Sequence, residues 1–561
     1  MTWLVPLPVI LPLLGAGLTL MLSRRPRLQR AVSTTVFAAV VAVAATLLVE
    51  VDRRGPQVLW IGAWKEPLGI SLVADRLSAL MLLVSSVVSL TVLAYSIGQG
   101  MTGDERDTPL TIYHPTFLVL AAGVSNAFLA GDLFNLFVSF EMLLFASYVL
   151  LTLGGTSARI RAGTIYVVVN VVSSSLFLIS IAAVYAATGS VNLAQLAQRI
   201  SDLPDSVSLL LQLLLLTTFS IKAAVFPLSF WLPDSYPTAP APVTAVFAGL
   251  LTKVGIYAII RTQTLLFPDS PLSDLLLAAA LLTLIVGILG AVAQTDIKRM
   301  LSFTLVSHIG YMVFGISLGT VAGYAGAIFY VAHHIIIQTT LFLVLGLVER
   351  RGGSTSLIRL GGLARLSPLL GLLFFVPAMN LAGIPPMSGF LGKVALTEAG
   401  LRVGTPLAYA VVAAGMVTSL LTLYAVAKAW NLAFWRTPQE AHERARELSD
   451  LDRLPGAEAL VSHRDHVHLG ASTYGLRDQD EARRIVDEAD DSNQDLYQLT
   501  NQGLLDNRLP RTMVGATGAL VACSLALTLV AGPLFDYARH AAQDILDRDQ
   551  YISSVLPGGS R

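Results

Sequence analysis

Seven ionisable side chains lie inside long apolar stretches of this sequence, where a charged group is costly. They are Glu141, Lys222, Lys253, His308, His333, His334 and Lys393. Placing a charge at the centre of a bilayer costs at least ~2.5–3.5 kcal/mol on insertion scales. A lone histidine there would be interpreted as a satisfied core residue. Several titratable groups at similar depth on separate helices instead indicate a proton path, because each can bind and release a proton.

Glu141 and Lys222 are expected to form a pair inside the membrane. Burial disfavours the charged form of an ammonium group, and a neighbouring carboxylate favours it. The charge of the glutamate would then control when the lysine holds its proton. Asp75, Arg76 and Asp132 lie near the ends of apolar stretches, and we interpret them as interfacial caps rather than as members of the path.

The elements that must position these residues are transmembrane helices. Of the 561 residues, 54% are hydrophobic and 13% are charged, against about 25% charged in an average soluble domain. Apolar runs long enough to cross a bilayer core of roughly 30 Å recur along the chain. The predicted fold is an all-α polytopic membrane protein without strands, because an open sheet edge cannot face lipid. About fourteen spans are expected, at 3–22, 31–50, 75–98, 114–130, 133–153, 163–187, 207–235, 241–261, 273–294, 300–318, 322–348, 367–402, 406–435 and 512–532.

Two of these spans are too long for one uninterrupted helix. The seventh is broken at Pro227 and the twelfth at Pro385-Pro386, since proline removes a backbone donor and interrupts the helix. Broken helices at matching positions of two halves point to a transport site built on inverted repeats. Because the two breaks are five spans apart, we expect two inverted five-helix repeats, spans 4–8 and 9–13.

The domain organisation follows from the spans. We predict helices 1–3 at residues 1–113, the first repeat at 114–261, the second at 273–435, a hydrophilic insertion at 436–511, and the last transmembrane helix with a C-terminal tail at 512–561. Arginine and lysine are more frequent in the loops on one side, which places the N-terminus outside and the insertion in the cytoplasm.

Several function classes are disfavoured by composition. The single cysteine, Cys523, cannot build an iron–sulfur cluster or a disulfide within the chain. The formal net charge is zero, which suggests no nucleic-acid partner. No nucleotide-binding motif is obvious. We therefore expect neither a cofactor nor a bound metal, and lipid as the surrounding medium.

Five stretches carry a resemblance to a known family. They are "SFEMLLFASYVLL", "IKAAVFPLSFWLPDSYPTAPAPVTAVFAGLLTKVGIYAIIR", "DIKRMLSFTLVSHIGYMVFG", "HHIIIQTTLFLVLG" and "GIPPMSGFLGKVAL". Over roughly residues 70 to 435 the chain resembles the antiporter-like membrane subunits shared by respiratory complex I and Mrp-type multisubunit cation/proton antiporters. The paired histidines, and lysine rather than glutamate in span twelve, look most like the D-type subunits of Mrp antiporters.

The resemblance implies fourteen helices, two inverted repeats and a hydrophilic central axis. It implies Glu141, Lys222, Lys253, one of His333 and His334, and Lys393 as the proton carriers. It also implies other Mrp subunits as partners, with the large A subunit and the small C subunit adjacent. The insertion at 436–511 is longer than the resemblance leads us to expect.

The function expected from these features is proton translocation as one subunit of a sodium/proton antiporter in the bacterial inner membrane, a transporter subunit rather than an enzyme. One alternative is a proton-pumping subunit of a complex I-like NADH:quinone oxidoreductase or of a membrane-bound hydrogenase, which would use the same carriers with energy from other subunits. A redox or quinone-binding subunit and a structural scaffold are further alternatives, disfavoured by the absence of cluster ligands and by the intact set of carriers.

Overall fold

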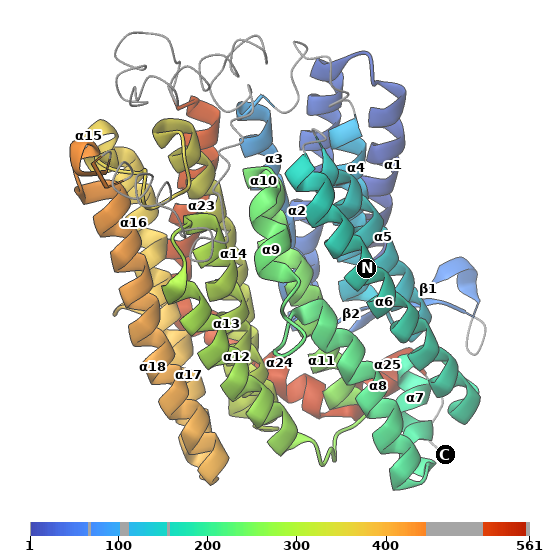
Figure 1. The fold of residues 1–561 in the computed structure, drawn as a ribbon. Coiled ribbons are helices and arrows are strands. Elements are labelled where there is room, and N and C mark those ends of the chain that lie inside the picture. The colour runs from blue at the N-terminus through green and yellow to red at the C-terminus, as the bar shows by residue number, and fades with distance from the viewer. Residues whose placement is uncertain are drawn as a thin grey trace.

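A computed structural model describes residues 2–64, 69–100, 112–153, 157–441, 443–444 and 509–556. In it the chain is a bundle of long helices with short connections (Figure 1). Twelve of the described helices are long and apolar enough to cross a membrane, so the predicted all-α polytopic class is confirmed. The other two predicted spans correspond to a 17-residue helix and to a span divided into helices of 15 and 16 residues. The total of fourteen stays a prediction.

The long helices fall into three groups and a final helix. The first group is η1 (Thr2–Leu4), α1 (Leu7–Met21), α2 (Pro26–Arg54) and α3 (Arg76–Gly98). The second is α4 (Tyr113–Leu129), α5 (Leu133–Thr152), α6 (Ser157–Thr188), α8 (Asp205–Ala223), α10 (Ala241–Val246), the π-helical turn η6 (Phe247–Leu251) and α11 (Thr252–Leu265). The third is α12 (Ser273–Ala293), α13 (Ile297–Ser317), α14 (Val321–Gly352), α16 (Pro368–Ala382), α17 (Ser388–Val403), α18 (Pro406–Ala429) and the π-helical turn η7 (Trp430–Trp435). The final long helix is α23 (Arg511–Leu529).

Shorter helices connect the long ones. They are α7 (Leu193–Arg199), η4 (Ile200–Asp202), α9 (Leu232–Ser235), η5 (Tyr236–Thr238) and α15 (Leu363–Leu366). The centre of the bundle is formed by α14 and by the run from α10 to α11, whose most apolar windows are buried completely inside the protein. These two elements carry three of the seven ionisable residues predicted for the site.

Both predicted helix breaks are confirmed, and they share one backbone pattern. Helix α8 is followed by Ala224 and α16 by Gly383, each with a left-handed backbone conformation of the kind that commonly terminates helices. In each break the next amide bonds back into the helix end: Val225 N to Ser220 O at 3.0 Å and Ile384 N to Met379 O at 3.1 Å. The proline positions read from the sequence therefore coincide with real interruptions.

The same recurrence is found where α5 and α13 begin. Asp132 forms an isolated antiparallel bridge with Asn192, and Asp296 forms one with Ser356. Each aspartate caps the helix that follows it, and the next helices, α6 and α14, both have 32 residues. We propose from these parallels that residues 114–261 and 273–435 are two copies of one five-helix unit.

Two features depart from the expectations. A two-stranded antiparallel sheet, β1 (Gln57–Trp60) and β2 (Ser71–Ala74), pairs Gln57 with Ala74 between α2 and α3, so the expectation of no strands is wrong for this connection. The pair lies outside the twelve long apolar helices, and the outer edge of β2 is buried and bonded, since Gly131 N donates to Ser71 O at 2.9 Å. The connection between β1 and β2 also holds the short turn η2 (Ile61–Ala63).

The C-terminal tail is more structured than the sequence predicted. Helix α24 (Ala531–Leu546) runs across the lower end of the bundle in Figure 1 and packs on α3, α11 and α14. Alanines and Ile545 form its buried side, and α25 (Arg548–Val555) follows. We call this end of the bundle the α24 face. Most of the hydrophilic insertion predicted at 436–511 lies outside the described residues.

Gly255 permits the close contact between α11 and α8. A Cβ at this position would lie 2.7 Å from Ala223 N. We therefore expect Gly255→Ala to lower the thermal unfolding temperature of the purified protein, since over-packing typically costs ~1–3 kcal/mol. Gly518→Ala on α23 is the control, because nothing lies within 4 Å of the added carbon and alanine favours a helix over glycine. Equal unfolding temperatures for the two variants would contradict this assignment.

Candidate functional site

Lys222 lies in the last turn of α8, directly before the break. Its side chain is buried, and Nζ donates to Ser174 Oγ at 3.1 Å and to Asn170 O at 3.5 Å, both on α6. The ring of Phe140 on α5 lies 5.7 Å from Nζ. A cation is favoured at this place because the C-terminal end of a helix carries a partial negative charge.

The expected ion pair between Glu141 and Lys222 is not formed in this structure. Lys222 has neutral oxygen partners, and Glu141 Oε1 is buried without a hydrogen-bond partner among the described residues. The reason is the face of α5 on which the glutamate lies. Glu141 shares its side of the helix with the exposed Phe134 and Phe145, at helical spacing, whereas the neighbouring Phe140 faces the lysine.

Lys253 is fully buried near the start of α11, two residues after the π-helical turn η6. Its Nζ donates to Ala248 O at 2.6 Å. A π-turn interrupts the regular ladder of α-helical hydrogen bonds and is frequent at functional sites, and here a carbonyl of the turn accepts from the lysine. Because η6 packs on α14, Lys253 lies beside the helix that carries the two adjacent histidines.

His308 and His334 bring α13 and α14 together. Tyr330 Oη lies 2.8 Å from His308 Nδ1, and Thr422 Oγ1 lies 3.4 Å from His308 Nε2. The His334 ring is 5.3 Å from the His308 ring, centroid to centroid. Both nitrogens of His334 are buried and have no hydrogen-bond partner among the described residues, so this imidazole can accept or donate a proton without breaking a hydrogen bond seen here.

His333 faces the second helix break rather than His308. Its Nδ1 lies 3.0 Å from Ser388 Oγ at the start of α17. Ser388 Oγ is in turn 3.3 Å from Asn380 Oδ1, which also accepts from Gly389 N at 2.8 Å. The broken helix thus builds a small polar network against α14, where an unbroken helix would have used the same backbone groups internally.

Lys393 lies on α17 and reaches back to the end of α16. Its Nζ donates to Leu381 O at 3.0 Å and to Ala382 O at 2.9 Å, two carbonyls that the break leaves available. The Tyr311 ring lies 5.2 Å from Nζ. Tyr311 is also 5.3 Å from the Tyr330 ring, so the two tyrosines connect the lysine to the histidines.

The predicted residues therefore occupy two regions. Lys253, His308 and Lys393, on α11, α13 and α17, lie around the two histidines of α14. Lys222 and Glu141 lie with α5, α6 and α8. The sequence did not identify the hydrogen-bonding neighbours Ser174, Tyr311, Tyr330 and Ser388. Only Ser388 had a signal, because it stands two residues after the Pro385-Pro386 break. Among the described residues, no group of three His, Cys, Asp or Glu side chains is placed to hold a metal ion.

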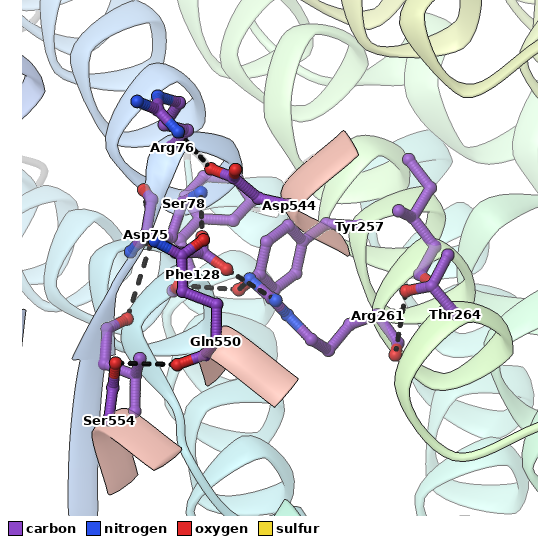
Figure 2. Close-up of polar contacts among 12 residues, drawn as sticks. Asp75, Arg76, Ser78, Phe128, Tyr257, Arg261, Thr264, Asp544, Gln550 and Ser554 are labelled. Carbon is purple, nitrogen blue, oxygen red and sulfur yellow. Dashed lines mark hydrogen bonds and ion pairs between the residues drawn. The ribbon is translucent and has the colours of Figure 1, made fainter. Parts of the chain in front are cut away.

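The two aspartates interpreted as caps do cap helices. Asp75 Oδ1 accepts from Ser78 N at 2.9 Å, and Asp132 Oδ1 accepts from Asn135 N at 2.6 Å. Burial raises the pKa of Asp132 to about 6. Asp75 also forms a buried ion pair with Arg261, 2.6 Å apart (Figure 2). Burial raises the pKa of Asp75, but the guanidinium and the hydrogen bonds from Ser78 outweigh it and hold the pKa below its ordinary value.

Comparison with known proteins agrees with this architecture. The family model described as "NADH:quinone oxidoreductase/Mrp antiporter, TM" matches residues 130–422. The D-type subunit of the Na+/H+ antiporter from Alkalihalophilus pseudofirmus is 41% identical, covering 79% of this chain and 89% of that protein. The corresponding Na+/H+ antiporter protein of Bacillus subtilis, also a D-type subunit, is 39% identical, covering 79% and 90%.

A solved chain shares the whole fold. A chain in the structure of the Mrp complex from a Dietzia species superposes with a TM-score of 0.82 at 32% identity, covering 99% of this chain and all of that one. The matched family model extends over both helix breaks and all seven of the predicted ionisable residues. This chain belongs to the family of membrane subunits shared by NADH:quinone oxidoreductase and the Mrp antiporters.

Proposed function

We propose that this chain is the proton-translocating membrane subunit of a multisubunit Na+/H+ antiporter of the Mrp type. The observation that carries the proposal is the kind of partner that the buried lysines have. Lys222, Lys253 and Lys393 donate to a hydroxyl group or to backbone carbonyls. Among the described residues none of the three has a carboxylate within ion-pair distance.

A neutral partner suits a group that must lose its proton. When a paired lysine is deprotonated, its carboxylate is left as an uncompensated buried charge, which is strongly unfavourable. Lys298 near the start of α13 shows the contrast, because it is held 2.7 Å from Glu349. The three buried lysines can become neutral at no such cost. Their ammonium groups are therefore suited to cycling, and that of Lys298 to a fixed charge.

The arrangement supports an order of transfer. In this proposal a proton passes between Lys222 and Lys253 of the first repeat, then to His334 and His308 of the second, and through the Tyr330 and Tyr311 region to Lys393. Of the adjacent histidines, His334 is the better carrier because its nitrogens have no competing hydrogen bond, whereas His333 is held by Ser388. Glu141, on the outward side of α5, would set the charge near Lys222.

The assembly follows from the relatives. We propose that the chain works as a transporter subunit rather than as an enzyme, in the cell membrane of a bacterium, alongside other Mrp subunits with A-type and C-type subunits adjacent. The proposed orientation puts the insertion at 436–511 in the cytoplasm and the α24 face outside.

The alternative is a pumping subunit of a complex I-like oxidoreductase. It is favoured by the fold alone, since a complex I chain from Thermus thermophilus is only 21% identical at a TM-score of 0.72.

The two functions are separated by what drives proton movement. The native complex is purified through a tag on this chain, its subunits are identified, and it is reconstituted into liposomes. We expect an imposed sodium gradient to move protons in the absence of NADH and quinone. A complex that contains quinone-reductase subunits, and that moves protons only when NADH and quinone are supplied, would overturn the proposal.

A further inference from the structure

A buried ion pair that the proposed path does not use lies at the α24 face. Asp75 Oδ2 and Arg261 Nη1 are 2.6 Å apart, and their side chains are 6% and 5% exposed. Figure 2 shows Arg261 extending from α11 toward Asp75 at the start of α3. The neighbouring Arg76 instead pairs with Asp52 and Asp544 nearer the surface.

Helix α11 connects this pair to Lys253. Lys253, Tyr257 and Arg261 are each four residues apart, so they lie on one face of the helix at steps of roughly 6 Å along its axis. All three are buried. Tyr257 Oη accepts from Arg261 Nη2 at 3.1 Å and donates to Phe128 O at 2.7 Å. Three buried polar side chains therefore share one face of α11 between Lys253 and its C-terminal end, and the last two of them are hydrogen-bonded to each other.

Capping explains only half of the Asp75 carboxylate. One oxygen, Oδ1, caps α3 through Ser78 N, and an asparagine would serve there equally well. The other oxygen is committed to Arg261, and a buried ion pair contributes little net stability compared with apolar packing. The second oxygen and the arginine therefore call for a reason other than helix capping.

Arg261 is held in a way that allows its partner to become neutral. The guanidinium carbon lies 5.4 Å from the Tyr257 ring and 5.2 Å from the Tyr551 ring of α25. Aromatic faces attract a cation within about 6 Å. If Asp75 is protonated, the guanidinium keeps these two rings and the Tyr257 hydroxyl as partners. Tyr551 belongs to α25, so the C-terminal end of the chain contacts the guanidinium directly.

We propose that Asp75 is the site at which protons leave or enter this subunit at the α24 face, with Arg261 as the gate on its carboxylate. This inference rests on the proposed function. A proton leaves the Lys253 ammonium group, which becomes a neutral amine, and the Asp75 carboxylate gains it and becomes a carboxylic acid. The ion pair opens for this transfer, because the paired guanidinium favours the charged carboxylate, and Arg261 remains charged between its two rings. The reverse transfer closes the gate.

The test is sodium-driven proton movement in everted vesicles, with assembly followed on blue-native gels. Asp75→Asn keeps the cap but removes the proton site, so exchange should fall about a hundredfold, as when an obligatory proton-transfer group is lost. Asp75→Glu should retain exchange. The double variant Asp75→Asn/Arg261→Gln removes both charges and should be as inactive as Asp75→Asn. Glu398→Gln, which removes an exposed pair with Arg402, is the control and should be normal.

The variants distinguish a proton-binding role of Asp75 from a purely structural role as the counter-ion of Arg261. Normal exchange by assembled Asp75→Asn, or recovery in the double variant, would show that Asp75 is only a counter-ion and would overturn the inference. If neither assembles, Tyr257→Phe decides. It removes the hydroxyl group that accepts a hydrogen bond from Arg261, and exchange should fall about tenfold. Unchanged exchange would reject the proposed proton transfer along α11. Lys222→Met is run alongside: exchange retained there as well overturns the proposed function itself, not this inference alone.

Discussion

Lys393→Arg is expected to assemble normally and to lose sodium-driven proton exchange by about a hundredfold or more, the usual effect of removing an obligatory proton-transfer group. Arginine keeps the positive charge and can still donate to Leu381 O and Ala382 O, which hold the lysine now. It cannot release its proton in a protein. The variant therefore preserves the fixed charge at the end of α16 and removes only the ability to cycle.

Lys428 provides a matched control for this variant. Its Nζ donates to Val292 O at 3.0 Å and to Gln294 O at 2.9 Å, so it meets the end of α12 much as Lys393 meets the end of α16. We assign it no part in the path, and Lys428→Arg should exchange normally. Lys393→Ala should assemble and be inactive. An active Lys393→Arg complex, or an inactive Lys428→Arg complex, would refute the carrier role of Lys393.

Glu141→Gln is expected to give an assembled complex with a similarly large loss of exchange. The substitution keeps the size and the hydrogen-bonding ability of the side chain but removes its negative charge. Glu141 Oε1 is buried without a partner among the described residues, so no hydrogen bond observed at that oxygen is lost. If the carboxylate sets the charge beside Lys222, the neutral amide cannot replace it.

Exchange by this variant is measured on vesicles whose content of assembled complex has been matched. Glu398→Gln is again a suitable control, since Glu398 is exposed and pairs only with the exposed Arg402 among the described residues. Full activity of an assembled Glu141→Gln complex would remove the glutamate from the mechanism. Loss of assembly, with activity per assembled complex unchanged, would make Glu141 a structural residue at a subunit contact.

The spans and both breaks could be predicted because their causes are local in sequence. A run of apolar residues has to be a helix in lipid, and a proline inside it removes a backbone donor and often interrupts that helix, although Pro12 and Pro377 stay within α1 and α16. Pro227 and Pro385-Pro386 therefore sufficed to place the ends of α8 and α16. The buried ionisable residues could be named for the same reason, because a charge in an apolar run stands out whatever its neighbours are.

The partners of those residues could not be predicted, because they depend on packing between distant helices. Tyr330 and His308 belong to different helices, and nothing in either stretch shows that they meet. The direct ion pair expected between Glu141 and Lys222 is not formed, for the same reason. Helical spacing alone did not reveal that Phe140, rather than Glu141, faces the lysine.

At the α24 face, Asp75 has two roles, and only one of them depends on residues near it in the sequence. The cap on α3 was predictable from the position of Asp75 just before an apolar run. Its ion pair with Arg261 joins α3 to α11, and the aromatic contact of Tyr551 with Arg261 comes from the C-terminal end of the chain. The ion pair depends on how α3 and α11 pack, and the Tyr551 contact on the path of α24 and α25 across the bundle, which the short amphipathic stretches after residue 530 did not predict.

The most direct test of the account is sodium-driven proton movement by complexes that carry Lys222→Met. Methionine is close to lysine in length and suits the apolar surroundings of α8, α6 and Phe140, so the complex should assemble. It has no proton to give, and collapse of the pH gradient on sodium addition to everted vesicles should fall to about a hundredth of the normal rate. Assembled Lys222→Met complexes that collapse the gradient at the normal rate would contradict the claim that this chain moves protons through its buried lysines.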